Sequence, residues 1–281
     1  CILKGQGNAL LYPDPYMRTP GDIDIYLAGG RKRVMKYVNK VCPNQVMRYH
    51  HVDFPVMKTA IEVHFTPSYM FFPVHNSRMQ KWFKEVMGEQ CNHRVSLPDG
   101  YGEIHVPQVS FNVIYILSHL HRHIFTEGIG LRQLLDYYFV LLKWHMDLTN
   151  LTNSNNSLPQ MTQINTDLDA LRHELKYLGL WKFAGAVMYV LHEVFGLTED
   201  RMIAPMDERE GRFLLDEIMR GGNFGQYDDR MGSKVGESKI HRYFRMNLRN
   251  LRFVKHYPTE ALSEPLFRTW FALWKKIHGI R

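Results

Sequence analysis

The sequence lacks the features that most often place a protein in or beyond a membrane. Its 281 residues contain no uninterrupted apolar run of about 18 residues, the minimum for a membrane-spanning helix, and no secretory signal is visible at its start. Only three cysteines are present, widely spaced and without a CxxC pair. We therefore expect neither a disulfide framework nor a structural zinc site, and we expect a cytoplasmic protein.

An internal repeat and an initial methionine are missing too. The sequence begins at Cys1 inside an apolar run, so we expect the chain to be truncated at its N-terminus.

Hydrophobic residues make up 45% and charged residues 22%, the balance of a globular protein that buries a sizeable core. The net charge of +7 favours polyanions or a polyphosphate ligand, although the basic residues of 239–281 are more typical of solvated helix faces.

Two parts of different character follow one another along the chain. Residues 1–108 alternate short apolar runs with glycine and proline, a pattern typical of strands, whereas helical apolar spacing dominates residues 109–281. We predict an α+β protein, with an α/β domain over 1–108, truncated at its start, followed by a mostly helical domain over 109–281. Asn, Thr, Ser and Gln gather over residues 147–167, which predicts a polar loop there.

Acidic residues alternate with apolar ones in two of the predicted strands. Successive side chains of a strand point to opposite faces, so Asp22 and Asp24 face the same side. Like charges so close are unfavourable unless a cation or proton lies between them, and carboxylate oxygens suit Mg²⁺ or Mn²⁺. In the other strand, residues 60–65, Glu62 and His64 share a polar face. A third carboxylate beside the first two would complete a two-metal site.

A glycine turn precedes the acidic pair. An apolar run ends at Lys4 and Gly5, and a helical pattern begins near Asn8. Glycine lets the backbone approach a phosphate closely, and a helix N-terminus favours negative charge. Because Lys and Arg add charge-assisted contacts, we predict that Lys4, Gly5, Gln6 and Arg18 bind the phosphates of a nucleotide. Each motif alone is common, so the order of the motifs carries the argument.

That order resembles the nucleotidyltransferase superfamily of DNA polymerase β, in which a glycine turn precedes an acidic pair and a later third carboxylate. More closely, the chain resembles a family of uncharacterised bacterial nucleotidyltransferases. The matching motifs are LKG at 3–5, YP at 12–13, Arg18, GDID at 21–24 and EVH at 62–64. The resemblance implies a polymerase-β-like domain in which Asp22, Asp24 and Glu62 hold Mg²⁺ and carry catalysis. Gln6 departs from the Gly or Ser usual in the superfamily.

The implied reaction moves a nucleoside monophosphate from a nucleoside triphosphate, such as ATP, to an acceptor hydroxyl. Three classes of acceptor stay open: a small molecule, a protein side chain and an RNA end. Two other functions also stay open. One is a nucleotide- or nucleic-acid-binding module without turnover, and the other is a phosphohydrolase that uses the same metal site. Neither the preferred nucleotide nor the oligomeric state is indicated.

A histidine-rich helix is predicted at the start of the second domain. His119 and His123 are one turn apart and share a face. Two histidines so placed can bind zinc, but no HExxH glutamate accompanies them and packing is the commoner role. Arg132 and Asp136 are spaced as an ion pair on the next helix. In the similar family this helix pair faces the cleft, which implies that Arg132 binds the nucleotide and that His64, His119, His123 and Asp136 line the cleft.

Overall fold

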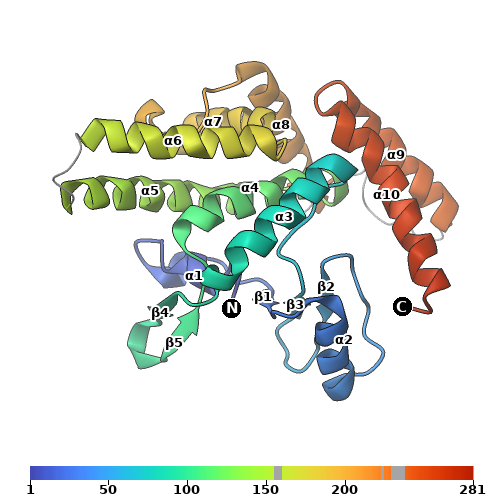
Figure 1. The fold of residues 1–281 in the computed structure, drawn as a ribbon. Coiled ribbons are helices and arrows are strands. Elements are labelled where there is room, and N and C mark those ends of the chain that lie inside the picture. Colours follow the sequence, from blue (N-terminus) through green and yellow to red (C-terminus); the bar gives the residue numbers. More distant parts are fainter. Residues whose placement is uncertain (155–159, 223–224, 229–237, 281) are drawn as a thin grey trace. The chain divides into compact units, whose positions relative to one another are not determined.

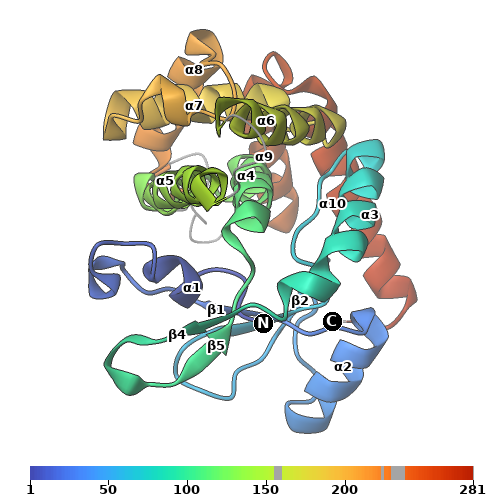
Figure 2. The ribbon, with the colours of Figure 1, turned by 60° about the vertical axis from the view of Figure 1, so that its left-hand side comes forward.

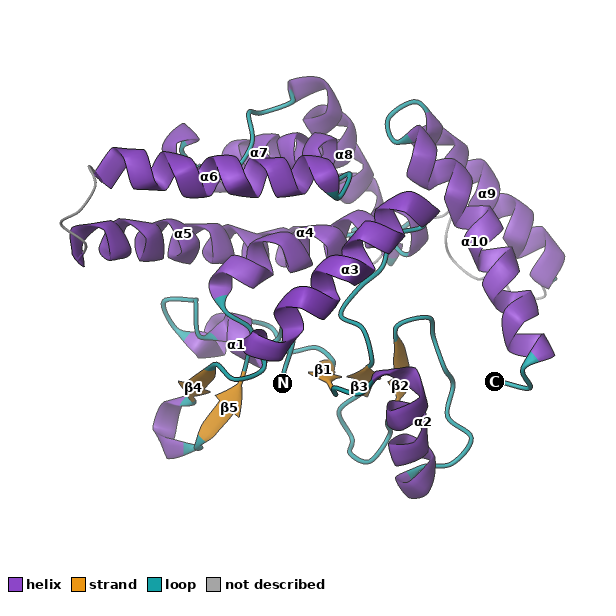
Figure 3. Ribbon diagram, in the orientation of Figure 1, coloured by secondary structure: helices purple, strands orange, loops and turns teal. Residues whose placement is uncertain are grey.

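The computed structural model describes residues 1–154, 160–222, 225–228 and 238–280. The chain is a mixed α+β protein in which helices predominate (Figure 3). Its internal contacts divide it into two compact units, each discontinuous in sequence. Unit 1 comprises Cys1–Tyr69, Met79–Tyr115 and Leu266–Arg281, and unit 2 comprises Met70–Arg78 and Ile116–Pro265. The domain boundary expected between residues 108 and 109 stays a prediction.

Unit 1 is built on a three-stranded sheet of order β1-β3-β2 (Figure 1). Strand β1 (Ile23–Tyr26) pairs in parallel with the central strand β3 (Ile61–His64), and β2 (His51–Asp53) pairs antiparallel with the other edge of β3. The register places Ile25 opposite Val63. The apolar residues of neighbouring strands therefore share one face, and the polar residues share the other. The two acidic strands expected from alternation are confirmed.

Helix α2 (Gly30–Val41) supplies the helical side of this unit's core. Its Val34 and Val38 are fully buried, and they belong to the hydrophobic cluster that contains the apolar strand residues. Phe271 and Trp274, from the C-terminal helix, pack against the same cluster. The buried members come from the sheet, the helix and the residues beside the strands: Val34, Val38, Met47, Val52, Ile61, Val63 and Phe65. Residues 31–40 have the amphipathic spacing that predicts a helix, and the structure confirms it.

Short elements and a hairpin complete the N-terminal half of the chain. Asp99 and Gly100 form a dipeptide that predicts a hairpin turn, and a two-stranded sheet forms there. Helix α3, which the sequence did not predict, follows β3. The elements are α1 (Gln6–Ala9), η1 (Pro15–Met17), α3 (Pro73–Gln90), β4 (Arg94–Ser96), η2 (Pro98–Gly100) and β5 (Glu103–His105).

Unit 2 is helical, as the apolar spacing predicted. Helices α5, α6 and α7 lie side by side in both ribbon views (Figures 1 and 2). Helix α7 is buried on all sides from Phe183 to Leu191, and α8 packs closely on it because Gly211 leaves room for the ring of Tyr189. The elements are α4 (Val109–Thr126), α5 (Leu131–Ser154), α6 (Gln160–Tyr177), α7 (Trp181–Phe195), η3 (Glu199–Arg201), α8 (Glu208–Gly221), α9 (Lys239–Val254) and α10 (Pro258–Ile277).

The polar loop predicted over 147–167 is wrong for most of its length. Helix α5 continues to Ser154 and α6 begins at Gln160, and residues 155–159 lie outside the described part of the chain. Asn and Thr are weak helix formers, but Leu148 is buried and α5 packs against α6 and α7. Tertiary packing of an apolar face outweighs the low propensity of the polar residues.

Within the described residues, no helix combines the length and apolarity needed to cross a bilayer.

Candidate active site

The face of the three-stranded sheet opposite the core carries ionisable side chains from all three strands. Asp24 of β1 is in register with Glu62 of β3, and Glu62 is in register with Asp53 of β2. Two residues after Glu62, on the same face of β3, His64 is in register with His51 of β2. The ligand atoms of Asp24, Glu62 and His64 lie within 4.8 Å of one another. The prediction that Glu62 lies beside the acidic pair on a neighbouring strand of one sheet is confirmed.

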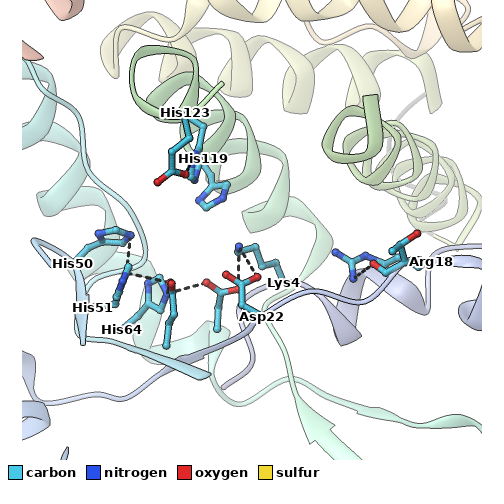
Figure 4. A network of polar contacts seen from close by, with 12 residues as sticks. Lys4, Arg18, Asp22, His50, His51, His64, His119 and His123 are labelled. Atoms are coloured by element: carbon cyan, nitrogen blue, oxygen red, sulfur yellow. Dashed lines mark hydrogen bonds and ion pairs between the residues drawn. The ribbon is translucent and has the colours of Figure 1, made fainter. Parts of the chain in front are cut away.

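The two aspartates of the acidic pair differ in exposure. Asp24 is only 2% exposed, whereas the side chain of Asp22, just before β1, is 42% exposed. The ammonium of Lys4 lies 2.9 Å from Oδ2 of Asp24 and 3.8 Å from Oδ1 of Asp22 (Figure 4). The cation that the sequence required between these carboxylates is therefore supplied, in this state, by the chain itself.

Backbone pairing at the start of the chain brings Lys4 to the acidic pair. Ile2 bridges antiparallel to Ile25, and the amide of Leu3 donates to the carbonyl of Asp24 at 2.9 Å. The next residue is consequently held against the same stretch of β1. Gly5 then turns the chain with a φ of 68°, a backbone conformation that side chains disfavour.

The predicted phosphate-binding residues occupy two segments. Helix α1 begins at Gln6, earlier than expected, and ends at Ala9. Such a single turn sums few peptide dipoles, so its attraction for phosphate is weaker than that of a full helix. Arg18 follows the turn η1 and is half-buried, with a guanidinium nitrogen 3.5 Å from the carbonyl of Thr19. Phosphate binding by Lys4, Gly5, Gln6 and Arg18 stays a prediction.

Burial and ion pairing act in opposite directions on the charged groups at the centre of the site. Burial alone would raise the pKa of Asp24, but the Lys4 ammonium and a hydrogen bond from His64 hold that pKa well below its usual range. Burial would likewise lower the pKa of His64, yet contacts with Asp24 and Glu62 raise it. The pKa of Lys4 is raised as well, because the attraction of Asp24 and Asp22 outweighs the burial of its ammonium. The site thus stabilises charged forms of both signs.

Three residues of this face escaped the sequence analysis. Nε2 of His50 lies 3.2 Å from Nδ1 of His51, and that Nδ1 lies 3.2 Å from Oε2 of Glu62 (Figure 4). Asp53 is 3.8 Å from the other nitrogen of His51. The alternation of His51, Val52 and Asp53 mirrors that of residues 62–64, so the signal was present. Three residues are too few for a periodicity to stand out.

The two histidines of unit 2 share a helix face, as predicted. The ring centroids of His119 and His123 are 4.3 Å apart on α4. The guanidinium of Arg122 approaches both rings, at 3.4 Å from His119 Nδ1 and 2.8 Å from His123 Nε2. Glu127 lies 3.0 Å from Nδ1 of His123. A fixed positive charge at both rings opposes zinc binding, so the geometry favours the packing role over the zinc alternative.

Arg132 and Asp136 lie one turn apart on α5, where Arg132 is half-buried and Asp136 is buried. Both belong to unit 2, as do His119 and His123. Lining of a nucleotide cleft by these four residues therefore stays a prediction.

The donor set on the sheet fits a divalent cation. In the described part of the chain, three groups bring metal-binding atoms within 4.8 Å of one another, and all three lie on this sheet and the residue before β2. One group is Asp24, Glu62 and His64, whose carboxylate oxygens suit Mg²⁺ or Mn²⁺. Asp22 is outside this group, with its Oδ1 3.8 Å from the Lys4 ammonium.

Comparison with known proteins adds one finding to this geometry. A family model described as "Uncharacterised nucleotidyltransferase" matches residues 1–196, which include the whole three-stranded sheet and helices α4 and α5. Neither the curated proteins nor the solved structures provide a significant match to the chain.

Proposed function

The chain belongs to this family of uncharacterised nucleotidyltransferases, and we propose that it transfers a nucleoside monophosphate from a nucleoside triphosphate to an acceptor hydroxyl at Asp22, Asp24 and Glu62. One observation carries the proposal: Asp24 and Glu62 face each other in register on parallel strands, inside the segment that the family model matches. We further propose that residues 1–108 are a polymerase-β-like domain and that residues 109–281 are a helical domain.

Each residue has a role that follows from its charge and position. Lys4 would leave Asp24 when a triphosphate binds and contact the phosphates as a point charge. Arg18 and the backbone at Gly5 and Gln6 would hold the same phosphates. Glu62 would accept the proton of the acceptor hydroxyl, directly or through water.

The reaction is then an in-line displacement at the α-phosphorus. A bond forms between the acceptor oxygen and phosphorus as the bond from phosphorus to the bridging oxygen breaks, and pyrophosphate leaves. When bound by Asp22, Asp24 and Glu62, Mg²⁺ or Mn²⁺ would stabilise the negative charge that this step spreads over the phosphate oxygens. The protein contributes mainly positioning and electrostatic stabilisation, as in phosphoryl transfer generally.

The ion pair between Lys4 and Asp24 also favours a second candidate. With Lys4 at 2.9 Å from Asp24, one of the two negative charges of the acidic pair is balanced without a metal. The same fold could therefore bind a nucleotide without turning it over. The +7 net charge would serve such a binding module equally well, because it attracts polyanions of any kind.

Labelled nucleotides separate these candidates. The protein is incubated with each of the four α-labelled nucleoside triphosphates and Mg²⁺, with cell extract as the source of acceptor. We expect label from one triphosphate to appear on a small molecule, a protein or an RNA, and the destination identifies the acceptor class. Retention of intact triphosphate with no transferred label would favour the binding module, and release of free nucleotide or phosphate would favour a phosphohydrolase.

A further inference from the structure

Three histidines form a compact cluster beside the acidic pair. His50, His51 and His64 are all buried, and their ring centroids are 4.4 to 5.0 Å apart. Each contributes a ring nitrogen to a set that lies within 4.8 Å. Burying three imidazoles removes six polar nitrogens from water, which is costly unless each finds a partner. Nδ1 of His64 is buried without a hydrogen bond among the described residues.

Glu62 joins this cluster through one oxygen. Oε2 lies 3.2 Å from Nδ1 of His51 and 3.5 Å from Nε2 of His64. Nδ1 of His51 is also 3.2 Å from Nε2 of His50. A ring nitrogen either donates one proton or accepts one, so Nδ1 of His51 makes only one of its two contacts as a full-strength hydrogen bond. Nε2 of His64 also lies 2.9 Å from Oδ1 of Asp24. A cation bound to these ring nitrogens would replace the protons that they share with neighbouring atoms.

Several separations among these atoms match those of metal ligands. An ion held tetrahedrally at about 2.0–2.2 Å separates its ligand atoms by about 3.3–3.6 Å. Three of the six separations that such a site requires are 3.2, 3.2 and 3.5 Å and fall close to this range. One ring nitrogen of each histidine lies within 4.8 Å of the other two. We propose that His50, His51, His64 and Glu62 form a binding site for a transition-metal ion of the Zn²⁺ class.

The chemistry of the donors selects the class of ion. Imidazole nitrogens suit Zn²⁺ and its neighbours in the first transition row, whereas Mg²⁺ prefers oxygen. Three neutral imidazoles with one anionic carboxylate are a ligand set typical of such ions. Asp53, 3.8 Å from Nε2 of His51, can orient that ring from outside, as carboxylates commonly do for metal-bound histidines.

This site goes beyond the proposed transfer, and the two share Glu62. Ion binding is therefore measured without nucleotide and without Mg²⁺, so that the result does not depend on whether the protein is a transferase. The probe is Zn²⁺ alone, titrated into metal-free protein by calorimetry. We expect one equivalent to bind. Separate His50→Gln and His51→Gln variants should each weaken that affinity by at least about tenfold, since even residues behind the ligands contribute 10–100-fold.

The matched control is His278→Gln, which removes an exposed histidine of the same unit and should leave affinity unchanged. Thermal unfolding of each metal-free variant identifies any that fails to fold. X-ray absorption at the zinc edge of the unmodified protein then decides the question without a variant, with at least two imidazoles and no sulfur as the expected ligand set. Absence of a bound equivalent would overturn the proposal. Sulfur coordination, as by Cys1 and Cys91 whose Sγ atoms are 3.1 Å apart, would also overturn it.

Discussion

Nε2 of His64 lies 2.9 Å from Oδ1 of Asp24, and both side chains are 1% exposed. The other oxygen of Asp24 lies 2.9 Å from the Lys4 ammonium. Asp24 thus lies between the His64 ring, on a neighbouring strand, and the Lys4 ammonium, near the start of the chain. Its charge is stabilised before any ligand arrives, which the depressed pKa of Asp24 expresses.

The acidic pair is the first target for substitution. Asp22→Asn combined with Asp24→Asn removes both charges while keeping the size of each side chain. We expect the double variant to lose transfer of α-label completely, because no carboxylate pair is left to hold the divalent ion. Glu103→Gln, an exposed carboxylate in the hairpin, is the control and should transfer at the wild-type rate. Full activity in the double variant would remove these residues from the mechanism.

The pairing of Lys4 with Asp24 predicts an effect on stability. The charges of Asp22 and Asp24 alone suggest that Asn at both positions would relieve repulsion, but the Lys4 ammonium already reduces that repulsion. Asp24→Asn should therefore destabilise the fold by about 1–3 kcal/mol, because it deprives the buried end of Lys4 of its charged partner. Adding Lys4→Met should recover part of that loss. Urea denaturation of Asp24→Asn, of Lys4→Met and of the variant that combines them measures the coupling free energy between the two residues. Strictly additive changes in the free energy of unfolding would contradict the ion pair.

Much of this face could be predicted from the sequence. Alternation of Asp22 and Asp24 with isoleucines, and of Glu62 with valine, placed the three carboxylates on one face of adjacent strands. The sequence could not predict that Lys4 is their counter-ion. That contact depends on the bridge between Ile2 and Ile25, and pairing over such a sequence separation leaves no local signal. Here Lys4 was assigned to phosphate alone.

Two other differences have the same physical origin. The loop predicted over 147–167 was assigned from composition, yet burial of Leu148 keeps α5 helical to Ser154. Strand β2 was missed because the alternation of its three residues is too short to stand out, and its pairing with β3 fixes it as a strand. In both cases tertiary contacts, which a sequence read locally does not show, decide the structure.

The raised pKa of His64 predicts how stability changes with pH. A histidine whose folded pKa exceeds its unfolded value, about 6.5, contributes stability that is complete below that pH and is lost as pH rises through the folded pKa. The protein should therefore lose stability above about pH 6.5, and His64→Gln should flatten this part of the profile. Melting temperatures of both proteins from pH 5.5 to 9 provide the measurement. Parallel profiles would mean that His64 is not stabilised in its charged form.

Glu260 is a buried carboxylate of unit 2, as Asp24 is of unit 1. Its carboxylate is 2% exposed and accepts hydrogen bonds from the amides of Phe71 at 2.7 Å and Phe72 at 3.0 Å, and Nδ1 of His75 lies 2.9 Å away. Burial would raise its pKa, but the contact with His75 and the backbone bonds lower it. Glu260→Gln should cost about 1–3 kcal/mol. Glu208→Gln, an exposed carboxylate on α8, should change stability by less than about 0.5 kcal/mol.

The dependence of stability on pH at acid pH tests the same residue. Because the folded pKa of Glu260 is depressed, its contribution is present above the unfolded value of about 4.3 and is lost as pH falls through the folded pKa. The wild type should therefore approach the Gln variant in stability below about pH 4. A stability difference that does not shrink on acidification would contradict an ionised Glu260.

Arg132 decides whether unit 2 takes part in nucleotide binding. If the helix pair α4 and α5 lines the cleft, Arg132→Ala should weaken triphosphate affinity by roughly tenfold or more, because a charge-assisted contact to phosphate is worth about 1.5–3 kcal/mol. Its melting temperature should change little, since the ion pair that the spacing predicts with Asp136 would contribute at most about 1 kcal/mol with a half-buried arginine. Arg212→Ala, whose exposed guanidinium pairs with Glu208 on α8, serves as the matched control for loss of a positive charge. Calorimetric titration with a non-hydrolysable triphosphate and a thermal melt, run on both variants, give the two quantities. A lowered melting temperature with unchanged affinity would make Arg132 part of the scaffold, and catalysis would then depend on the carboxylates of unit 1 alone.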